Sequence, residues 1–81
     1  MIRITLYGRA DCHLCHEMRA VVEAVGREFA VELEEIDVDA DPELVAAYGE
    51  QVPVLCVNDR RAFKYSVTAE VLRARLVREP A

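Results

Sequence analysis

The segment that decides the fold reads Asp11-Cys12-His13-Leu14-Cys15-His16, and it follows the alternating run Ile2-Arg3-Ile4-Thr5-Leu6-Tyr7. The alternation predicts a strand, and from Cys12 onward the apolar residues recur at helical spacing. Two thiols therefore lie where a strand turns into a helix. The unpaired N–H groups and the positive dipole end of a helix stabilise a thiolate. We expect Cys12 to be the ionised, attacking sulfur, and Cys15, one turn later, to close a small disulfide loop with it.

The rest of the chain adds two helices and three strands to this unit. In chain order the predicted elements are a strand at 2–7, a helix at 12–28, a strand at 31–38, a short helix at 41–49 capped by Asp41, a strand at 52–57 with Pro53 at its entry, a turn at 58–59, a strand at 61–65 and a helix ending at 77. The apolar positions shift parity within 31–38, which indicates a bulge or an edge strand.

The last helix has two candidate caps, Thr68 and Ser66. Ser and Thr side chains at this position accept a hydrogen bond from a free N–H group of the first turn. We expect the helix to bury the three apolar residues Val71, Leu72 and Leu76. The tail at 78–81 is expected to fray.

The order βαβαββα predicts an α/β fold with one four-stranded mixed sheet and helices on both faces. A strand, a helix and a strand form a right-handed parallel crossover, and the terminal hairpin adds antiparallel strands. At 81 residues the chain is long enough for one core and not for two. We therefore expect a single domain, 1–81.

Composition narrows the class of protein. Hydrophobic residues make up 53% and charged residues 31%, which is typical of a globular chain. The net charge is −5, and only acidic charges occur from Glu28 to Asp59, so nucleic acid is excluded as a partner. This acidic run is either a solvated edge that prevents strand pairing or a docking surface for a basic reductase or client. We see no membrane-spanning stretch or secretory leader, and expect a cytoplasmic monomer.

The chain resembles a glutaredoxin, a small member of the thioredoxin-like superfamily, from residue 2 to about residue 77. The element order, Cys12-x-x-Cys15 at the strand-to-helix junction, and Gln51-Val52-Pro53 carry the resemblance. The last motif stands where the family has a cis-proline before the third strand. The chain is closest to small bacterial glutaredoxin-like proteins with C-x-x-C. The resemblance implies a thioredoxin-like fold and a thiol–disulfide oxidoreductase that serves electron transport and cell redox homeostasis.

The resemblance also assigns roles to residues. Cys12 would attack a substrate disulfide, and Cys15 would resolve the mixed disulfide, leaving a Cys12–Cys15 redox disulfide for an external reductant. A cis bond at Val52-Pro53 would expose the backbone of Val52 to an extended peptide or to glutathione. Arg9 stands where glutaredoxins place a basic residue that holds the glutathione carboxylate. The partners implied are a disulfide-containing protein or glutathione, together with a thiol reductase system.

Three departures from the glutaredoxin pattern concern glutathione. The chain has His13-Leu14 in place of Pro-Tyr, Gln51 in place of Thr, and Asn58-Asp59 where we expect the Gly-Gly turn that binds the γ-glutamyl end. We therefore expect protein disulfides, or a dedicated reductase, to be handled better than glutathione. No bound cofactor is expected, and glutathione remains a candidate co-substrate.

Other readings of the cysteine segment stay open. His13 and His16 are either exposed residues without a role, or ligands, or, for His13, a charge that tunes Cys12. Cys12-x-x-Cys15-His16 matches the haem attachment pattern C-x-x-C-H, although so small an α/β domain has little space for haem. A zinc site would need a fourth ligand, and Cys56 lies in an apolar strand as a buried small hydrophobe. The alternative function is glutathione-assisted iron–sulfur cluster or metal binding through Cys12.

Overall fold

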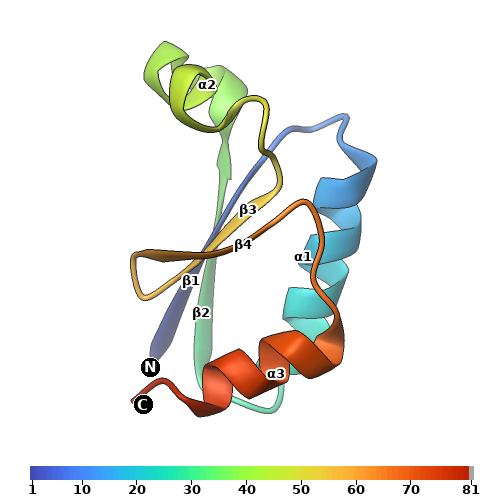
Figure 1. The fold of residues 1–81 in the computed structure, drawn as a ribbon, viewed down its shortest axis with the longest axis vertical. Coiled ribbons are helices and arrows are strands. Elements are labelled where there is room, and N and C mark those ends of the chain that lie inside the picture. Colours follow the sequence, from blue (N-terminus) through green and yellow to red (C-terminus); the bar gives the residue numbers. More distant parts are fainter. Residues whose placement is uncertain (81) are drawn as a thin grey trace.

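A four-stranded sheet with the order β2-β1-β3-β4 forms the centre of the computed structural model, which describes residues 1–80. The strands are β1 (Ile2–Gly8), β2 (Val31–Asp37), β3 (Val54–Val57) and β4 (Arg60–Lys64). β1 pairs in parallel with β2 and antiparallel with β3, and β3 pairs antiparallel with β4. The predicted mixed sheet and the order βαβαββα are confirmed, with one added 3-10 turn (Figure 1).

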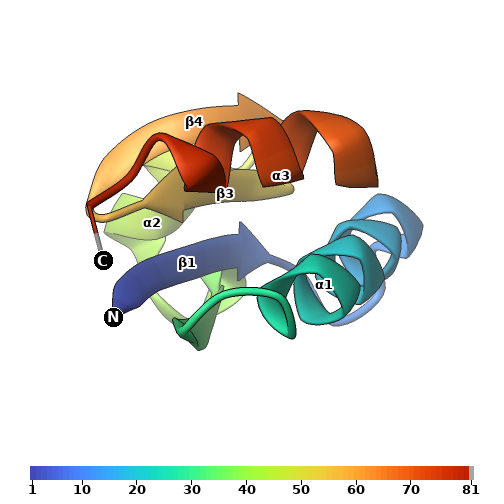
Figure 2. The ribbon, with the colours of Figure 1, turned by 90° about the horizontal axis from the view of Figure 1, so that it is seen from below.

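The helices cover the sheet unevenly. They are α1 (His13–Gly26), α2 (Pro42–Tyr48) and α3 (Ala69–Val77), and the 3-10 turn η1 (Val38–Ala40) precedes α2. Figures 1 and 2 show α1 and α3 together on one side of the sheet, while α2 stands at the end to which β2 leads. The Tyr48 ring of α2 stacks on Tyr7 of β1, with ring centres 4.4 Å apart. Neighbouring residues of a strand point to opposite faces of the sheet, so Tyr7 lies on the face opposite to Leu6 and the core. The stacking on Tyr7 therefore places α2 on the face opposite to α1 and α3, and helices lie on both faces, as predicted.

The core lies between the sheet and the α1–α3 layer. Alternate residues of β1 point into it, and α1 and α3 contribute one apolar stripe each. Its fully or nearly fully buried members are Ile2, Ile4, Leu6, Met18, Val22, Val25, Leu55, Val57, Leu72 and Leu76. This single core holds the C-terminal end of β1 and the start of α1 in a fixed relation. No helix in residues 1–80 is long and apolar enough to cross a membrane.

Several local predictions need correction. Val71 is 50% exposed rather than buried, because the core side of α3 is already filled by Leu72 and Leu76. The first helix ends at Gly26 rather than Glu28, and the third strand begins at Val54. Thr68, not Ser66, caps α3, and its Oγ1 accepts a hydrogen bond from Val71 N at 3.2 Å.

The parity shift in the second strand does not come from a bulge. β2 is an edge strand and pairs with β1 without a bulge from Val31 to Asp37. Val38 then leaves the strand, begins η1 and is fully buried. The edge-strand alternative is therefore confirmed. The register shift of the sheet lies between β3 and β4 at Leu55 and Cys56.

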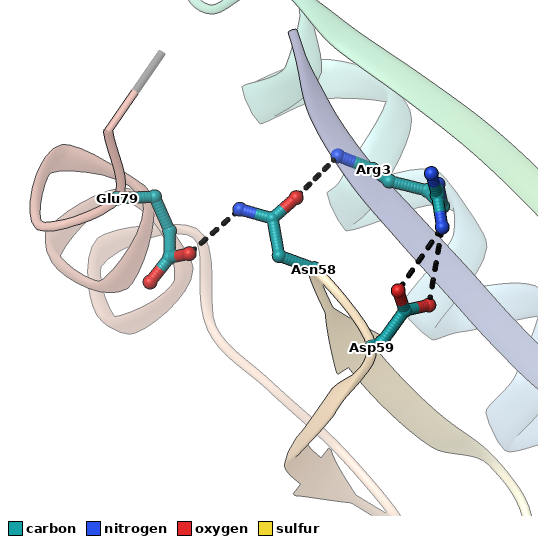
Figure 3. Close-up of polar contacts among 4 residues, drawn as sticks. All are labelled: Arg3, Asn58, Asp59 and Glu79. Carbon is teal, nitrogen blue, oxygen red and sulfur yellow. Dashed lines mark hydrogen bonds and ion pairs between the residues drawn. The ribbon is translucent and has the colours of Figure 1, made fainter.

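The Asn58-Asp59 turn lies at the opposite end of the sheet from the cysteines. Figure 3 shows Asn58 between two partners: its Oδ1 accepts from Arg3 N at 2.9 Å, and its Nδ2 donates to Glu79 Oε1 at 2.7 Å. Arg3 also pairs with Asp59, Nη1 to Oδ2, at 3.0 Å. β1 begins beside this turn and runs away from it, so Asn58-Asp59 does not replace a glutathione-binding turn.

The described part of the tail is anchored rather than frayed at Glu79. The Glu79 side chain is only 12% exposed and also pairs with Arg75. Ala81, the last residue of the predicted frayed tail, lies outside the described residues. The network at the turn therefore ties the end of α3 to the start of β1.

Candidate functional site

Cys12 is the N-cap of α1. Its backbone is extended, with φ −99° and ψ 112°, and its Sγ accepts a hydrogen bond from Cys15 N at 3.1 Å. The two sulfurs are joined in a disulfide, as predicted. Cys12 is partly exposed, whereas Cys15 is only 4% exposed. Cys12 is therefore the more accessible of the two sulfur-bearing residues.

Gly8 lets the buried cysteine pack closely against the end of β1. A β-carbon added at Gly8 would lie 3.0 Å from Cys15 Sγ and 3.1 Å from Cys15 Cβ. Both distances are shorter than an ordinary carbon contact of about 3.5–4.0 Å. In the sequence, Gly8 lies between the predicted strand at 2–7 and the predicted helix at 12–28, and nothing there singles it out. Its role follows from the close approach of α1, which no local pattern shows.

Val52 and Pro53 lie at the same end of the sheet. The Val52-Pro53 bond is cis, as predicted, and Val54 pairs with Tyr7 near the end of β1. Pro53 is buried, and its carbonyl accepts a hydrogen bond from Tyr65 N at 2.8 Å. Val52 is half-buried, and its own N–H and carbonyl make no backbone hydrogen bond within residues 1–80. Those two groups are free to bind an extended segment.

A groove lies between α1 and the segment after β4, and Leu14 at the start of α1 lines it. Its volume is about 260 Å³. Its lining residues are Leu14, Glu17, Met18, Val21, Tyr65, Ser66 and Val67. Leu14, between the two cysteines, and Tyr65 are both exposed large hydrophobic residues. The segment after β4, rather than the Asn58-Asp59 turn, therefore lies across this groove from Leu14, the residue between the two cysteines.

Arg9 already has a carboxylate partner. Its Nε lies 3.1 Å from Asp39 Oδ1 of η1, and its guanidinium packs against Gly49. The interaction connects the loop before Cys12 to the segment that carries α2. A glutathione carboxylate would have to compete with Asp39 for this side chain.

The two histidines have different surroundings. The His13 side chain is 86% exposed, and its Nε2 lies 3.4 Å from Glu17 Oε1. His16 lines a cavity of about 390 Å³ together with the buried Cys15. The cavity opens between α1 and β2. Sequence reasoning did not find it, because it depends on how the edge strand packs beside the helix.

Cys56 is the third cysteine, and it lies apart from this site. It is a free, buried residue of β3, paired with Thr5 of β1. Burial raises the pKa of its thiol, so little thiolate forms near neutral pH. The prediction of a buried small hydrophobe is confirmed. Within residues 1–80 no three His, Cys, Asp or Glu side chains form a group that could hold a metal ion.

Comparison with known proteins finds a matching family and several similar solved structures. The family described as "Glutaredoxin-like domain (DUF836)" matches residues 3–77. Protein XcR50 from X. campestris is 38% identical, with a TM-score of 0.77 and coverage of 95% of this chain and 99% of that chain. Protein Ne2328 from Nitrosomonas europaea is 33% identical, with a TM-score of 0.78 and coverage of 91% and 89%.

A third similar structure carries a functional description. NrdH-redoxin from Escherichia coli, described as a glutaredoxin-like protein with a thioredoxin-like activity profile, is 31% identical, with a TM-score of 0.67 and coverage of 98% and 97%. A search of curated proteins found no match.

Proposed function

The chain belongs to the glutaredoxin-like domain family, and on that premise we propose that it is a thiol–disulfide oxidoreductase whose Cys12 attacks and whose Cys15 resolves. The family and the C-x-x-C pair support a thiol–disulfide redox role in general. One observation carries the finer assignment of the two sulfurs. Cys12 is partly exposed and accepts the Cys15 N–H at the start of α1, while Cys15 is buried behind it.

The first step uses the helix start. In the reduced protein the Cys12 thiolate accepts a hydrogen bond from the Cys15 N–H. The positive dipole end of α1 also stabilises its negative charge. A hydrogen bond to a charged group contributes about 1.5–3 kcal/mol. The thiolate forms a bond to one sulfur of the substrate disulfide, and the other substrate sulfur leaves as a thiolate. The product is a mixed disulfide on Cys12.

The second step closes the pair. Cys15 loses its proton and attacks Cys12 Sγ, so the bond between Cys12 and the substrate breaks and the Cys12–Cys15 bond forms. The substrate leaves reduced by two electrons, and the protein carries the disulfide. An external dithiol then reduces the Cys12–Cys15 disulfide by two further exchange steps and is itself oxidised to a disulfide. A reducing compartment such as the cytoplasm suits this cycle, because the disulfide must be reopened after each turnover.

Protein disulfides are the proposed substrate class. The free backbone groups of Val52 and the exposed Leu14 and Tyr65 offer an extended peptide both hydrogen bonds and apolar contact. Glutathione is the weaker co-substrate, because Asp39 already occupies Arg9. The thioredoxin-like activity profile described for NrdH-redoxin supports this preference. We propose that the protein acts as a monomer with a dedicated thiol reductase.

Trapping the mixed disulfide tests the assignment. Reduced Cys15→Ser is expected to accumulate a covalent adduct on Cys12 with a disulfide-bonded peptide, because the resolving thiol is missing. Cys12→Ser is expected to form no adduct, and the control Cys56→Ser should retain full exchange. Mass spectrometry of the intact protein and of its peptides locates the adduct. An adduct on Cys15 in Cys12→Ser, with none on Cys12 in Cys15→Ser, would overturn the proposal.

A further inference from the structure

His16 and Cys15 share a cavity that opens between α1 and β2. The cavity measures about 390 Å³. A water molecule takes about 30 Å³ of liquid volume, so the space accommodates several. His16 is exposed, and its side chain makes no hydrogen bond or ion pair within residues 1–80. His16, whose side chain has no protein partner within residues 1–80, and the buried Cys15 therefore line the same water-accessible space.

The buried position of Cys15 makes loss of its proton difficult. A group that is only 4% exposed loses most of its hydration, and burial disfavours the charged form of a thiol. The backbone N–H of Cys15 points to Cys12 Sγ rather than to its own sulfur. The resolving step of the proposed cycle needs the Cys15 thiolate. A proton acceptor near the sulfur would supply it.

Five titratable or charged side chains face the cavity from three segments. They are Arg9 from the loop after β1, His16 and Arg19 from α1, and Glu35 and Asp37 from β2. Arginine does not give up its proton in proteins. Glu35 is paired with Arg19 at 3.0 Å, and Asp37 Oδ1 accepts from Asp39 N at 2.9 Å. A carboxylate is ordinarily a much weaker base than imidazole, so among these groups histidine is the best proton acceptor for a thiol near neutral pH.

We propose that His16 is the proton acceptor for Cys15 in the resolving step, either directly or through one water of this cavity. The inference rests on the proposed dithiol cycle. The Cys15 proton moves to the free imidazole nitrogen, the thiolate attacks Cys12 Sγ, and the substrate sulfur leaves with the electron pair of the broken bond. The imidazolium then returns its proton to the departing thiolate or to water. In the reverse direction the imidazolium protonates Cys15 as the disulfide opens.

The two steps are separated by single-turnover reaction with dithiobis(nitrobenzoate), an aromatic disulfide. Reduced protein releases one coloured thionitrobenzoate when Cys12 attacks and a second when Cys15 resolves. The first rate depends on reagent concentration and the second does not. His16→Gln is the test variant. Its matched comparison is His13→Gln, on the same helix turn but paired with Glu17 and outside the cavity.

In His16→Gln we expect the rate of the second release at pH 7 to fall by about ten- to a hundredfold. The upper figure is the smallest effect that is typical of a general base. The first release should change less than about twofold. The wild-type second rate should depend on pH through an ionisation that His16→Gln removes, so in the variant the second rate should keep rising with pH as the buried Cys15 thiol itself ionises. His13→Gln should leave the second rate and its pH dependence unaltered.

Three results would overturn the assignment. One is an unchanged second rate and pH profile in His16→Gln. Another is an equal slowing by His13→Gln, which would indicate a general charge effect of the helix start. The third is a slower second release in Glu35→Gln with no slowing in His16→Gln, which would make the Glu35 carboxylate the proton acceptor. Failure of the proposed cycle looks different, because then the wild type itself would release no second thionitrobenzoate.

Discussion

Gly8→Ala tests whether the close approach of β1 to Cys15 is required by the site. The substituted β-carbon would lie 3.0 Å from Cys15 Sγ and 3.1 Å from Cys15 Cβ. An ordinary contact begins at about 3.4–3.5 Å, so one of the two segments would have to give by a few tenths of an ångström. Both are held by the core on either side, and neither neighbouring atom is the far end of a flexible side chain. The strain therefore falls on the position of Cys15.

Two opposing terms decide the sign of the effect. Replacing glycine by alanine at a compatible backbone stabilises by about 0.4–1 kcal/mol through the unfolded chain, and Gly8 has no positive φ. Overpacking of a tightly packed site costs about 1–3 kcal/mol. The difference between the two ranges is a loss of about 0–2.6 kcal/mol, centred at about 1.3 kcal/mol, so we expect oxidised Gly8→Ala to be less stable than the wild type.

Gly26→Ala is the matched control. Its added β-carbon would meet the Val31 side chain at 3.7 Å, an ordinary contact. At the end of α1 we expect a gain of up to about 1 kcal/mol. Urea unfolding of the three oxidised proteins, followed by circular dichroism, measures both changes. A Gly8→Ala protein as stable as the wild type, with Gly26→Ala behaving as expected, would refute the argument from contact distance.

Two further predictions concern the α3 side of the molecule. Leu72→Ala should lower the free energy of unfolding by about 2–5 kcal/mol, because a fully buried side chain is lost. Val71→Ala should change it by less than about 0.5 kcal/mol, because Val71 is half exposed. Equal losses in urea unfolding would contradict the packing described for α3. The hydrogen bond from Asn58 and the Arg75 ion pair lower the pKa of Glu79 below its usual value. Its stabilisation is therefore present above the unfolded-state pKa of about 4.3 and is lost as pH falls through the lower folded value. The stability advantage of wild type over Glu79→Gln should shrink in acid, and a difference that stays constant from pH 7 to pH 3 would contradict this.

Much of the architecture was predictable because each element carries its own local signal. The alternation in β1, the helical spacing after Cys12 and the Asp41 cap all operate within a few residues, and Asp41 Oδ1 indeed accepts from Glu43 N at 2.9 Å. The position of the two thiols at the strand-to-helix junction follows from the same signals. The cis bond before β3 has no such local signal and was predicted only from the resemblance to glutaredoxins.

The errors arose where packing between elements makes the choice. Val71 and Leu72 are adjacent apolar residues, and only the position of α1 decides which of them faces the core. The sequence does not show which of His13 and His16 lies beside a cavity. That depends on the edge strand β2, which forms a cavity with α1 beside His16 only. The misplaced Asn58-Asp59 turn was avoidable. A strand that begins beside the cysteines and runs antiparallel to β1 must end at the far end of the sheet.

The two ends of the sheet differ in how their polar groups are satisfied, and this difference separates stability from activity. At the turn end, Asn58 bonds both Arg3 N and Glu79, so the start of β1 and the end of α3 are held together (Figure 3). At the cysteine end, the backbone groups of Val52 and the ring of His16 have no such partners within residues 1–80. Unpaired groups add nothing to folding but remain available to a substrate or a proton. Substitutions at Glu79 should therefore change unfolding without changing exchange, and substitutions at His16 should do the reverse.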